Sequence, residues 1–214
     1  VLAVVVGAVV GWYVSLDLIR ILSAPLGDEP LVFTTLGGAF FPRIKLALIV
    51  GVVLASPVVL YQLWAFVAPG LTPRERRAAR PWVPLALLFL AAGVGVAYLT
   101  LPYTVGFLLS FQVPNEIEPL ITFESYFSFV TTLFLAFGLV MEFPIVLVLL
   151  AKLGIVDVDR LRRARRYVLV GIFVIAVVVT PGGDPVSPTI MAAVMYPLYE
   201  LTIWLVARTN RKQE

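Results

Sequence analysis

Residues 127–150 read FSFVTTLFLAFGLVMEFPIVLVLL, an apolar stretch that contains one ionisable side chain, Glu142. A helix needs about 20 apolar residues to cross a hydrocarbon core roughly 30 Å thick, so this stretch predicts a transmembrane helix. A charge near the bilayer centre costs at least about 2.5–3.5 kcal/mol. Glu142 is therefore expected to have either a specific polar partner or a function.

The rest of the chain has the composition of a membrane protein. Of its 214 residues, 61% are hydrophobic and 14% are charged, whereas soluble domains are about half apolar and about a quarter charged. The chain contains no cysteine and no histidine, which excludes disulfides, thiol nucleophiles and the usual zinc and imidazole chemistry. We therefore expect neither a metal ion nor another cofactor.

Six stretches are apolar enough to predict transmembrane helices. The expected architecture is an all-α, polytopic integral membrane protein that forms a single transmembrane domain over residues 1–214. Because the chain begins with Val1 inside the first apolar stretch, we expect cytoplasmic residues upstream of it to be missing. The six predicted spans are Val1–Leu16, Ile44–Val67, Trp82–Leu101, Tyr126–Leu150, Tyr167–Thr180 and Thr189–Val206.

The basic residues predict the orientation of these spans. Of the 16 basic residues, four lie in LTPRERRAAR (71–80), six in KLGIVDVDRLRRARR (152–166) and three in the C-terminal tail. Basic residues near transmembrane helices stay on the cytoplasmic side. Both termini are therefore predicted to be cytoplasmic. The loops on the opposite side carry the acidic residues Asp28, Glu29, Glu116, Glu118 and Glu124.

The last two spans are predicted to be short. Tyr167–Thr180 has 14 residues, which corresponds to a helix about 21 Å long, and the sequence TPGG (180–183) ends it. The sixth span contains Pro197 and Glu200. Local thinning of the bilayer is the expected accommodation of such short spans.

Glu142 admits two interpretations. In the first it is a polar site for a translocated substrate or for another helix, and in the second it only fixes packing through a hydrogen bond to a neighbouring helix. Intramembrane ionisable residues are functional by default, which favours the first interpretation. Pro144 adds some support, because a proline frees a backbone carbonyl that must find another partner.

Glu75 also has two interpretations. It lies within RERR (74–77), where it balances charge in a solvated loop or accepts a guanidinium from a partner through bidentate hydrogen bonds. Spacing alone favours the solvated loop.

Enzyme signatures are missing from the sequence. The motif TPGGDPVSP (180–188) places Asp184 at a tight turn, but an intramembrane aspartyl protease needs a second aspartate to share a proton. A phosphate-binding loop, an HExxH motif and a Ser/His pair are also missing. The sequence therefore predicts a protein that is not an enzyme. The basic segment before the fifth span is interpreted mainly as topogenic, with contact to anionic lipid headgroups as a by-product.

The sequence resembles the TatC family, the polytopic core subunit of the twin-arginine protein translocase. FFPRIKLALIVGVVLASPVVLYQLWAFVAPGLTPRERR (40–77) is similar to the family's second span and first cytoplasmic loop. ESYFSFVTTLFLAFGLVMEFPIVLVLLAKLGIV (124–156) is similar to its fourth span, and RRYVLVGIFVIAVVVTPGGDPVS (165–187) and PLYE (197–200) continue the likeness.

The resemblance implies a signal-peptide receptor and scaffold in the cell inner membrane. Such a protein binds precursors with paired arginines in their signal peptides. It assembles with single-span TatA and TatB proteins, within a larger complex that contains several copies of the chain. Folded proteins then cross the membrane, driven by the proton-motive force. The implied partners also include membrane lipids but no nucleic acid.

The resemblance also implies roles for six residues. Glu75, Phe66 and Pro69 match the region that binds the signal peptide, which reverses the reading of Glu75 from spacing alone. Glu142 matches an intramembrane glutamate on the concave face of the family's helix bundle. Thr180 and Asp184 lie where its last two spans meet a partner helix.

The sequence departs from the family at two places. The N-terminal motif of the type His-Leu-x-Glu-Leu-Arg is absent, because the chain begins inside the first span, and Pro188 stands where many members have a glutamine. Two other functions compete with the translocase subunit: a small secondary transporter that uses Glu142 as a proton carrier, and a purely structural subunit of another complex.

Overall fold

The computed structural model describes residues 1–27, 29–70, 72–73, 76, 82–112, 120–152 and 155–210. Within these residues the chain is all-helical, apart from one isolated β-bridge between Val32 and Thr122. The prediction of an all-α fold is therefore confirmed. The elements are α1 (Leu2–Ser23), η1 (Ala24–Leu26), α2 (Phe40–Val67), η2 (Ala68–Gly70), α4 (Trp82–Leu109), α5 (Phe123–Met141), α6 (Phe143–Lys152), α7 (Val158–Val179), η3 (Pro181–Gly183) and α8 (Val186–Asn210).

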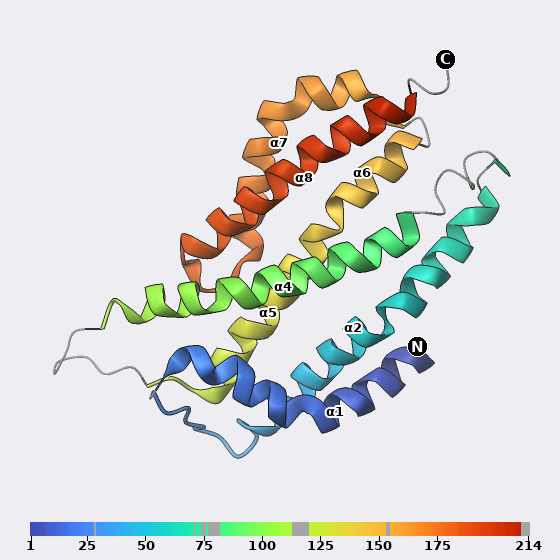
Figure 1. Ribbon diagram of the computed structural model, residues 1–214. Helices are drawn as coiled ribbons and strands as arrows, with labels where there is room; N and C mark the ends of the chain where they lie inside the picture. The colour runs from blue at the N-terminus through green and yellow to red at the C-terminus, as the bar shows by residue number, and fades with distance from the viewer. Residues whose placement is uncertain are drawn as a thin grey trace.

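These helices make six passes, with α5 and α6 together forming the fourth (Figure 1). Four of the passes are long and apolar enough to cross a membrane: Leu2–Leu26, Phe40–Phe66, Pro84–Leu109 and Phe123–Ala151. Helices α7 and α8 have 22 and 25 residues, but their apolar parts are shorter because arginines open α7 and because Pro197 and Glu200 interrupt α8.

Several helices extend beyond the predicted apolar spans. Helix α1 continues to Ser23 through Asp17 and Arg20, whose side chains form an exposed ion pair at 3.4 Å. Helix α7 begins at Val158 rather than at Tyr167, so the arginine-rich segment is helical. Hydrophobicity predicts where a helix crosses the membrane core, whereas backbone hydrogen bonding carries the helix further at each end.

Helices α1 and α2 pack with their backbones in contact (Figure 1). Gly7 and Gly11 of α1 face Gly51 and Ala47 of α2. A Cβ atom on Gly7 would lie 2.7 Å from the carbonyl oxygen of Gly51, and one on Gly11 would lie 2.5 Å from that of Ala47. Small residues at a helix crossing let the two backbones approach closely inside a membrane.

A polar contact also joins these two helices. The Arg43 Nε atom donates to Ser15 Oγ at 2.8 Å, and the guanidinium lies 4.2 Å from the centre of the Trp12 ring. Ser15 is fully buried. The Arg43 guanidinium of α2 is therefore held against α1 by a hydrogen bond and by a cation–π contact.

The core lies where α4 and α5 cross at the centre of the bundle (Figure 1). Its side chains come from α1, α2, α4, α5, α7 and α8, and the buried ones include Leu101, Phe127, Leu133, Phe137, Ala176 and Met191. Around this core, the segment after α1 pairs with the segment before α5, because Val32 accepts a backbone hydrogen bond from Phe123 at 2.7 Å.

The ends of the passes are sorted into two sides. The start of α1 and the end of α8 lie on the same side of the molecule as the end of α2, whereas the turn between α7 and α8 lies on the opposite side (Figure 1). This arrangement agrees with a chain that crosses an even number of times. It places both ends of the described chain on one face, and the cytoplasmic identity of that face stays a prediction from the basic residues.

Candidate functional site

Glu142 lies at a break between two helices. It follows the last residue of α5 and precedes Phe143, the first residue of α6. Its carbonyl oxygen accepts backbone hydrogen bonds from Ile145 at 3.1 Å and from Val146 at 3.2 Å, so it opens the second helix. Pro144 accounts for the break, because it cannot donate a hydrogen bond to the preceding helical turn and its ring crowds that turn.

The Glu142 side chain borders a large apolar groove. The groove has a volume of about 1140 Å³ and is lined by α1, α2, α4, α5 and α6. Glu142 is half-buried, and its Oε1 atom is buried without a hydrogen-bond partner among the described residues. Because a buried polar atom costs free energy until it is paired, this oxygen is available to a group that enters the groove.

Two hydroxyl groups in the lining of the groove are already paired. Ser56 donates to the carbonyl of Val53 at 2.7 Å, and Thr131 donates to that of Phe127 at 2.6 Å. Aliphatic and aromatic side chains make up nearly all of the remaining lining. The groove therefore suits an apolar segment that brings one polar group opposite Glu142.

The two ends of the groove differ in the side chains that lie beside them. At one end Lys45 of α2 donates to Ser128 of α5 at 3.1 Å, one helical turn before the lining residues Ile49 and Thr131. The opposite end runs along α2 to Leu63 and Trp64. The AFVAP segment (65–69) begins at the next residue of the chain.

The predicted signal-peptide residues lie at this second end or just beyond it. Phe66 is 84% exposed, so its ring is accessible at the surface. Pro69 in η2 is also exposed. Glu75, the third residue of this prediction, lies outside the described residues.

Thr180 and Asp184 lie at the turn between α7 and α8, and both are buried. The Thr180 hydroxyl donates to the carbonyl of Ala176 at 2.7 Å, and Asp184 Oδ2 accepts from the backbone N–H of Ser187 at 2.6 Å. Asp184 therefore caps the first turn of α8. Its Oδ1 atom is buried without a hydrogen-bond partner among the described residues. Nearby, the hydroxyls of Thr104 and Ser187 are 2.7 Å apart, which links the turn to α4.

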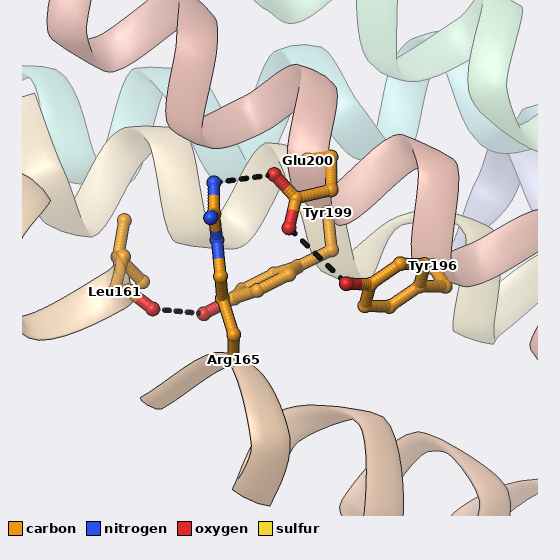
Figure 2. A network of polar contacts seen from close by, with 5 residues as sticks. All are labelled: Leu161, Arg165, Tyr196, Tyr199 and Glu200. Atoms are coloured by element: carbon orange, nitrogen blue, oxygen red, sulfur yellow. Dashed lines mark hydrogen bonds and ion pairs between the residues drawn. The ribbon is translucent and has the colours of Figure 1, made fainter. Parts of the chain in front are cut away.

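A polar network that the sequence did not predict joins α7 to α8 (Figure 2). Arg165 Nη2 lies 2.7 Å from Glu200 Oε2, and the Tyr196 hydroxyl donates to Glu200 Oε1 at 3.4 Å. Tyr199 is buried, and its hydroxyl donates to the carbonyl of Leu161 at 2.7 Å. One residue of the sequence could have indicated this network. Glu200 is a carboxylate within an apolar helix, and such a carboxylate requires a cation nearby.

We expect Tyr199→Phe to destabilise the protein more than Glu200→Gln. The first change removes a buried hydrogen bond between α7 and α8 and costs about 0.5–1.5 kcal/mol. The second removes an ion pair whose side chains are 48% and 33% exposed, and such pairs contribute about 0.2–1 kcal/mol. Thermal unfolding of the purified variants in detergent measures both. Equal losses would contradict this ranking.

The structure also limits the chemistry of the site. Among the described residues, no three acidic side chains gather in a way that could hold a metal ion. The features that remain are an apolar groove, an unpaired carboxyl oxygen within it and an exposed aromatic segment at its end. This arrangement can bind an apolar peptide segment.

The fold and the groove define a class: a polytopic helical membrane protein whose bundle is hollowed on one face and carries a carboxyl group inside the hollow. Within this class, the family model for the Sec-independent protein translocase protein (TatC) matches residues 1–193. The chain belongs to the TatC family.

Individual relatives agree with this family. The chain is 37% identical to the TatC protein of Carboxydothermus hydrogenoformans, over 100% of this chain and 88% of the relative. It is 38% identical to the TatC protein of Escherichia coli K12, over 90% of this chain and 76% of the relative. A crystal structure of the twin-arginine translocase receptor TatC in the detergent DDM is similar with a TM-score of 0.80 and 33% identity, covering 95% of this chain and 92% of that one.

Proposed function

We propose that this chain is the signal-peptide receptor and scaffold subunit of the twin-arginine translocase. As a member of the TatC family it is a multi-pass membrane subunit for protein transport. In this role it binds and orders other proteins rather than catalysing a covalent reaction. We place it in the cell inner membrane with both termini in the cytoplasm, where it takes part in the export of folded proteins driven by the proton-motive force.

The observation that carries this proposal is the apolar groove with its buried, unpaired Glu142 Oε1 atom. A signal peptide has an apolar segment that must leave water, and burial of apolar surface stabilises binding by roughly 25 cal/mol per Å². A groove with one polar atom also selects for position, because the occupant must bring a hydrogen-bonding group to the level of Glu142.

The twin arginines are proposed to bind beside the cytoplasmic end of the groove. A guanidinium forms bidentate hydrogen bonds with a carboxylate, and it also stacks on aromatic faces. Glu75 is the proposed carboxylate, and the exposed Phe66 and Pro69 provide the adjacent apolar surface. A signal peptide held at both places would have its arginines at the membrane surface and its apolar segment in the groove.

The partners are proposed to be single-span TatA and TatB proteins, together with membrane lipids and further copies of this chain. Thr180 and Asp184 are buried, so we propose that they shape the α7–α8 turn that a partner contacts. The neighbouring Gly182, Gly183 and Pro185 are exposed and form the surface available to such a helix. Pro188, in the first turn of α8, is buried.

The comparisons favour the translocase subunit over the two competing functions. The relatives and the solved structures support the family's role in protein translocation, and they do not support a small proton-coupled transporter. A transporter would also move solute as the purified chain alone, which liposomes can test.

Signal recognition is tested by photocrosslinking in membranes with the full-length protein. A photoreactive residue replaces Thr72, which is exposed and three residues before Glu75, and the bait is a precursor with paired arginines. We expect a crosslink that falls at least about tenfold when the arginine pair becomes a lysine pair, because lysine cannot form the bidentate contact.

The matched variants are Glu75→Ala and Glu29→Ala. We expect the first to remove the crosslink and the second, in a predicted loop on the opposite side, to leave it unchanged. A crosslink that ignores both the lysine pair and Glu75→Ala would remove the assignment of Glu75, while the membrane architecture would stand.

A further inference from the structure

The arginines at the start of α7 fall into two groups. Five of them lie within residues 160–166, a segment that the sequence alone explains as a topology signal. In the structure this segment is helical, and α7 lies at the edge of the bundle with α8 on its inner side (Figure 1). One face of α7 therefore packs on protein, and the other faces outward.

Two arginines are neutralised by acids. Arg165 pairs with Glu200 of α8 at 2.7 Å, and Arg160 lies 3.8 Å from Asp157. Leu161, next to Arg160, is buried against α8. These contacts leave less positive charge on the inner side of α7 than its composition suggests.

The other three arginines, Arg162, Arg163 and Arg166, are exposed. Among the described residues, no acidic group lies within ion-pair distance of any of them. Arg163 Nε donates to the backbone carbonyl of Asp159 at 3.2 Å, and the Arg166 guanidinium lies 5.0 Å from the centre of the Tyr167 ring. Their positive charges are therefore not balanced by the described part of the chain.

The same face of α7 continues as an apolar ridge. Val170, Phe173, Val174 and Val177 are about half exposed, with Phe173 at 49%. With 3.6 residues per turn, the three arginines and these four residues fall within an arc of about 120° around the helix. The outward face thus presents three guanidinium groups at its start and a continuous apolar surface beyond them.

We propose that Arg162, Arg163 and Arg166 form a binding site for the phosphate of an anionic phospholipid, whose acyl chains lie along the ridge from Val170 to Val177. Guanidinium groups bind phosphate through paired N–H donors. The apolar ridge directly below them is the feature that favours a lipid over a soluble anion, because only a lipid contacts both parts. A lipid with net negative charge is favoured over a zwitterionic one, since three positive charges face it.

The test uses the full-length protein purified in mixed micelles with equal amounts of phosphatidylglycerol and phosphatidylcholine. Native mass spectrometry then measures which lipid stays bound. We expect the unmodified protein to retain phosphatidylglycerol preferentially. The double variant R162Q/R166Q should lose this preference by about fivefold for each arginine removed. The matched control R20Q/R160Q also removes two positive charges, but from arginines that pair with Asp17 and Asp157. We expect this control to keep the preference for phosphatidylglycerol.

Three further arms separate the alternatives. A photoreactive phosphatidylglycerol should crosslink to residues 162–177 of the unmodified protein, which requires no substitution. The variant R162K/R166K keeps the charge, and it should retain more phosphatidylglycerol than the glutamine pair but less than arginine. Displacement of the lipid by inorganic phosphate would assign the site to a soluble anion and overturn the proposal. Equal loss in R162Q/R166Q and in the control would also overturn it, since general charge would then explain the preference.

Discussion

Gly51→Leu is expected to separate α1 from α2 and to lower the free energy of unfolding by about 3 kcal/mol or more. A Cβ atom on Gly51 would lie 2.5 Å from the backbone nitrogen of Ala8 and 2.8 Å from its Cα atom. Both are backbone atoms, so no side-chain rotation can relieve the overlap. Helix α1 would have to move away from its main packing partner. Thermal unfolding of the purified protein in detergent measures the loss.

The matched control is Gly106→Leu in α4. A Cβ atom there would meet nothing within 4 Å, and replacing a glycine within a helix is favourable by roughly 0.5–1 kcal/mol. We therefore expect Gly106→Leu to unfold at or above the temperature of the unmodified protein. If Gly51→Leu did the same, the close approach of α1 and α2 would be wrong.

Hydrophobicity was sufficient to predict the passes of this fold. Long apolar stretches can only be helices in a bilayer, because every backbone group must be paired within the segment. The position of Glu142 inside a span follows from the same reasoning, whereas the cytoplasmic placement of the arginines stays a prediction. These features depend on local composition, which a single sequence contains in full.

Contacts between distant residues could not be predicted in this way. Arg165 and Glu200 are 35 positions apart, and their pairing depends on how α7 and α8 are aligned. The sequence does contain a signal for the close packing of Gly7 and Gly11, because glycines four residues apart in an apolar helix indicate a close helix contact. The sequence could not identify α2 as the partner helix, since several apolar helices would serve equally well.

The candidate site could be predicted only in part, because its groove also depends on contacts between residues that are distant in the sequence. Its position inside an apolar span selected Glu142, and the resemblance to a family selected Phe66; the structure places Glu142 in the groove and Phe66 two residues after the lining residue Trp64. The groove beside Glu142 depends on the packing of five helices, which a single sequence does not reveal. The roles of these residues in binding stay predictions, as do those of Glu75, Pro69, Thr180 and Asp184.

Glu142→Met is expected to reduce export about fivefold or more while leaving the isolated protein as stable as before, or more stable. Methionine keeps a similar length and removes a buried oxygen that has no partner among the described residues. Removing an unpaired buried polar atom is neutral or stabilising, whereas a hydrogen bond to an occupant of the groove is worth about 1–3 kcal/mol, or roughly 5- to 150-fold in binding. Export of a twin-arginine precursor and thermal unfolding of the purified chain measure the two effects.

The two interpretations of Glu142 predict different combinations of unfolding temperature and export. If Glu142 only fixed packing, Glu142→Met would lower the unfolding temperature, and export would fall in proportion to the loss of folded protein. If it binds an occupant, export falls while the protein stays folded, and Glu142→Gln keeps part of the activity because an amide still forms a hydrogen bond. Glu124→Gln, at an exposed position in the first turn of α5, is the matched control and should change neither quantity. Full export by Glu142→Met would show that the groove functions without this carboxyl group.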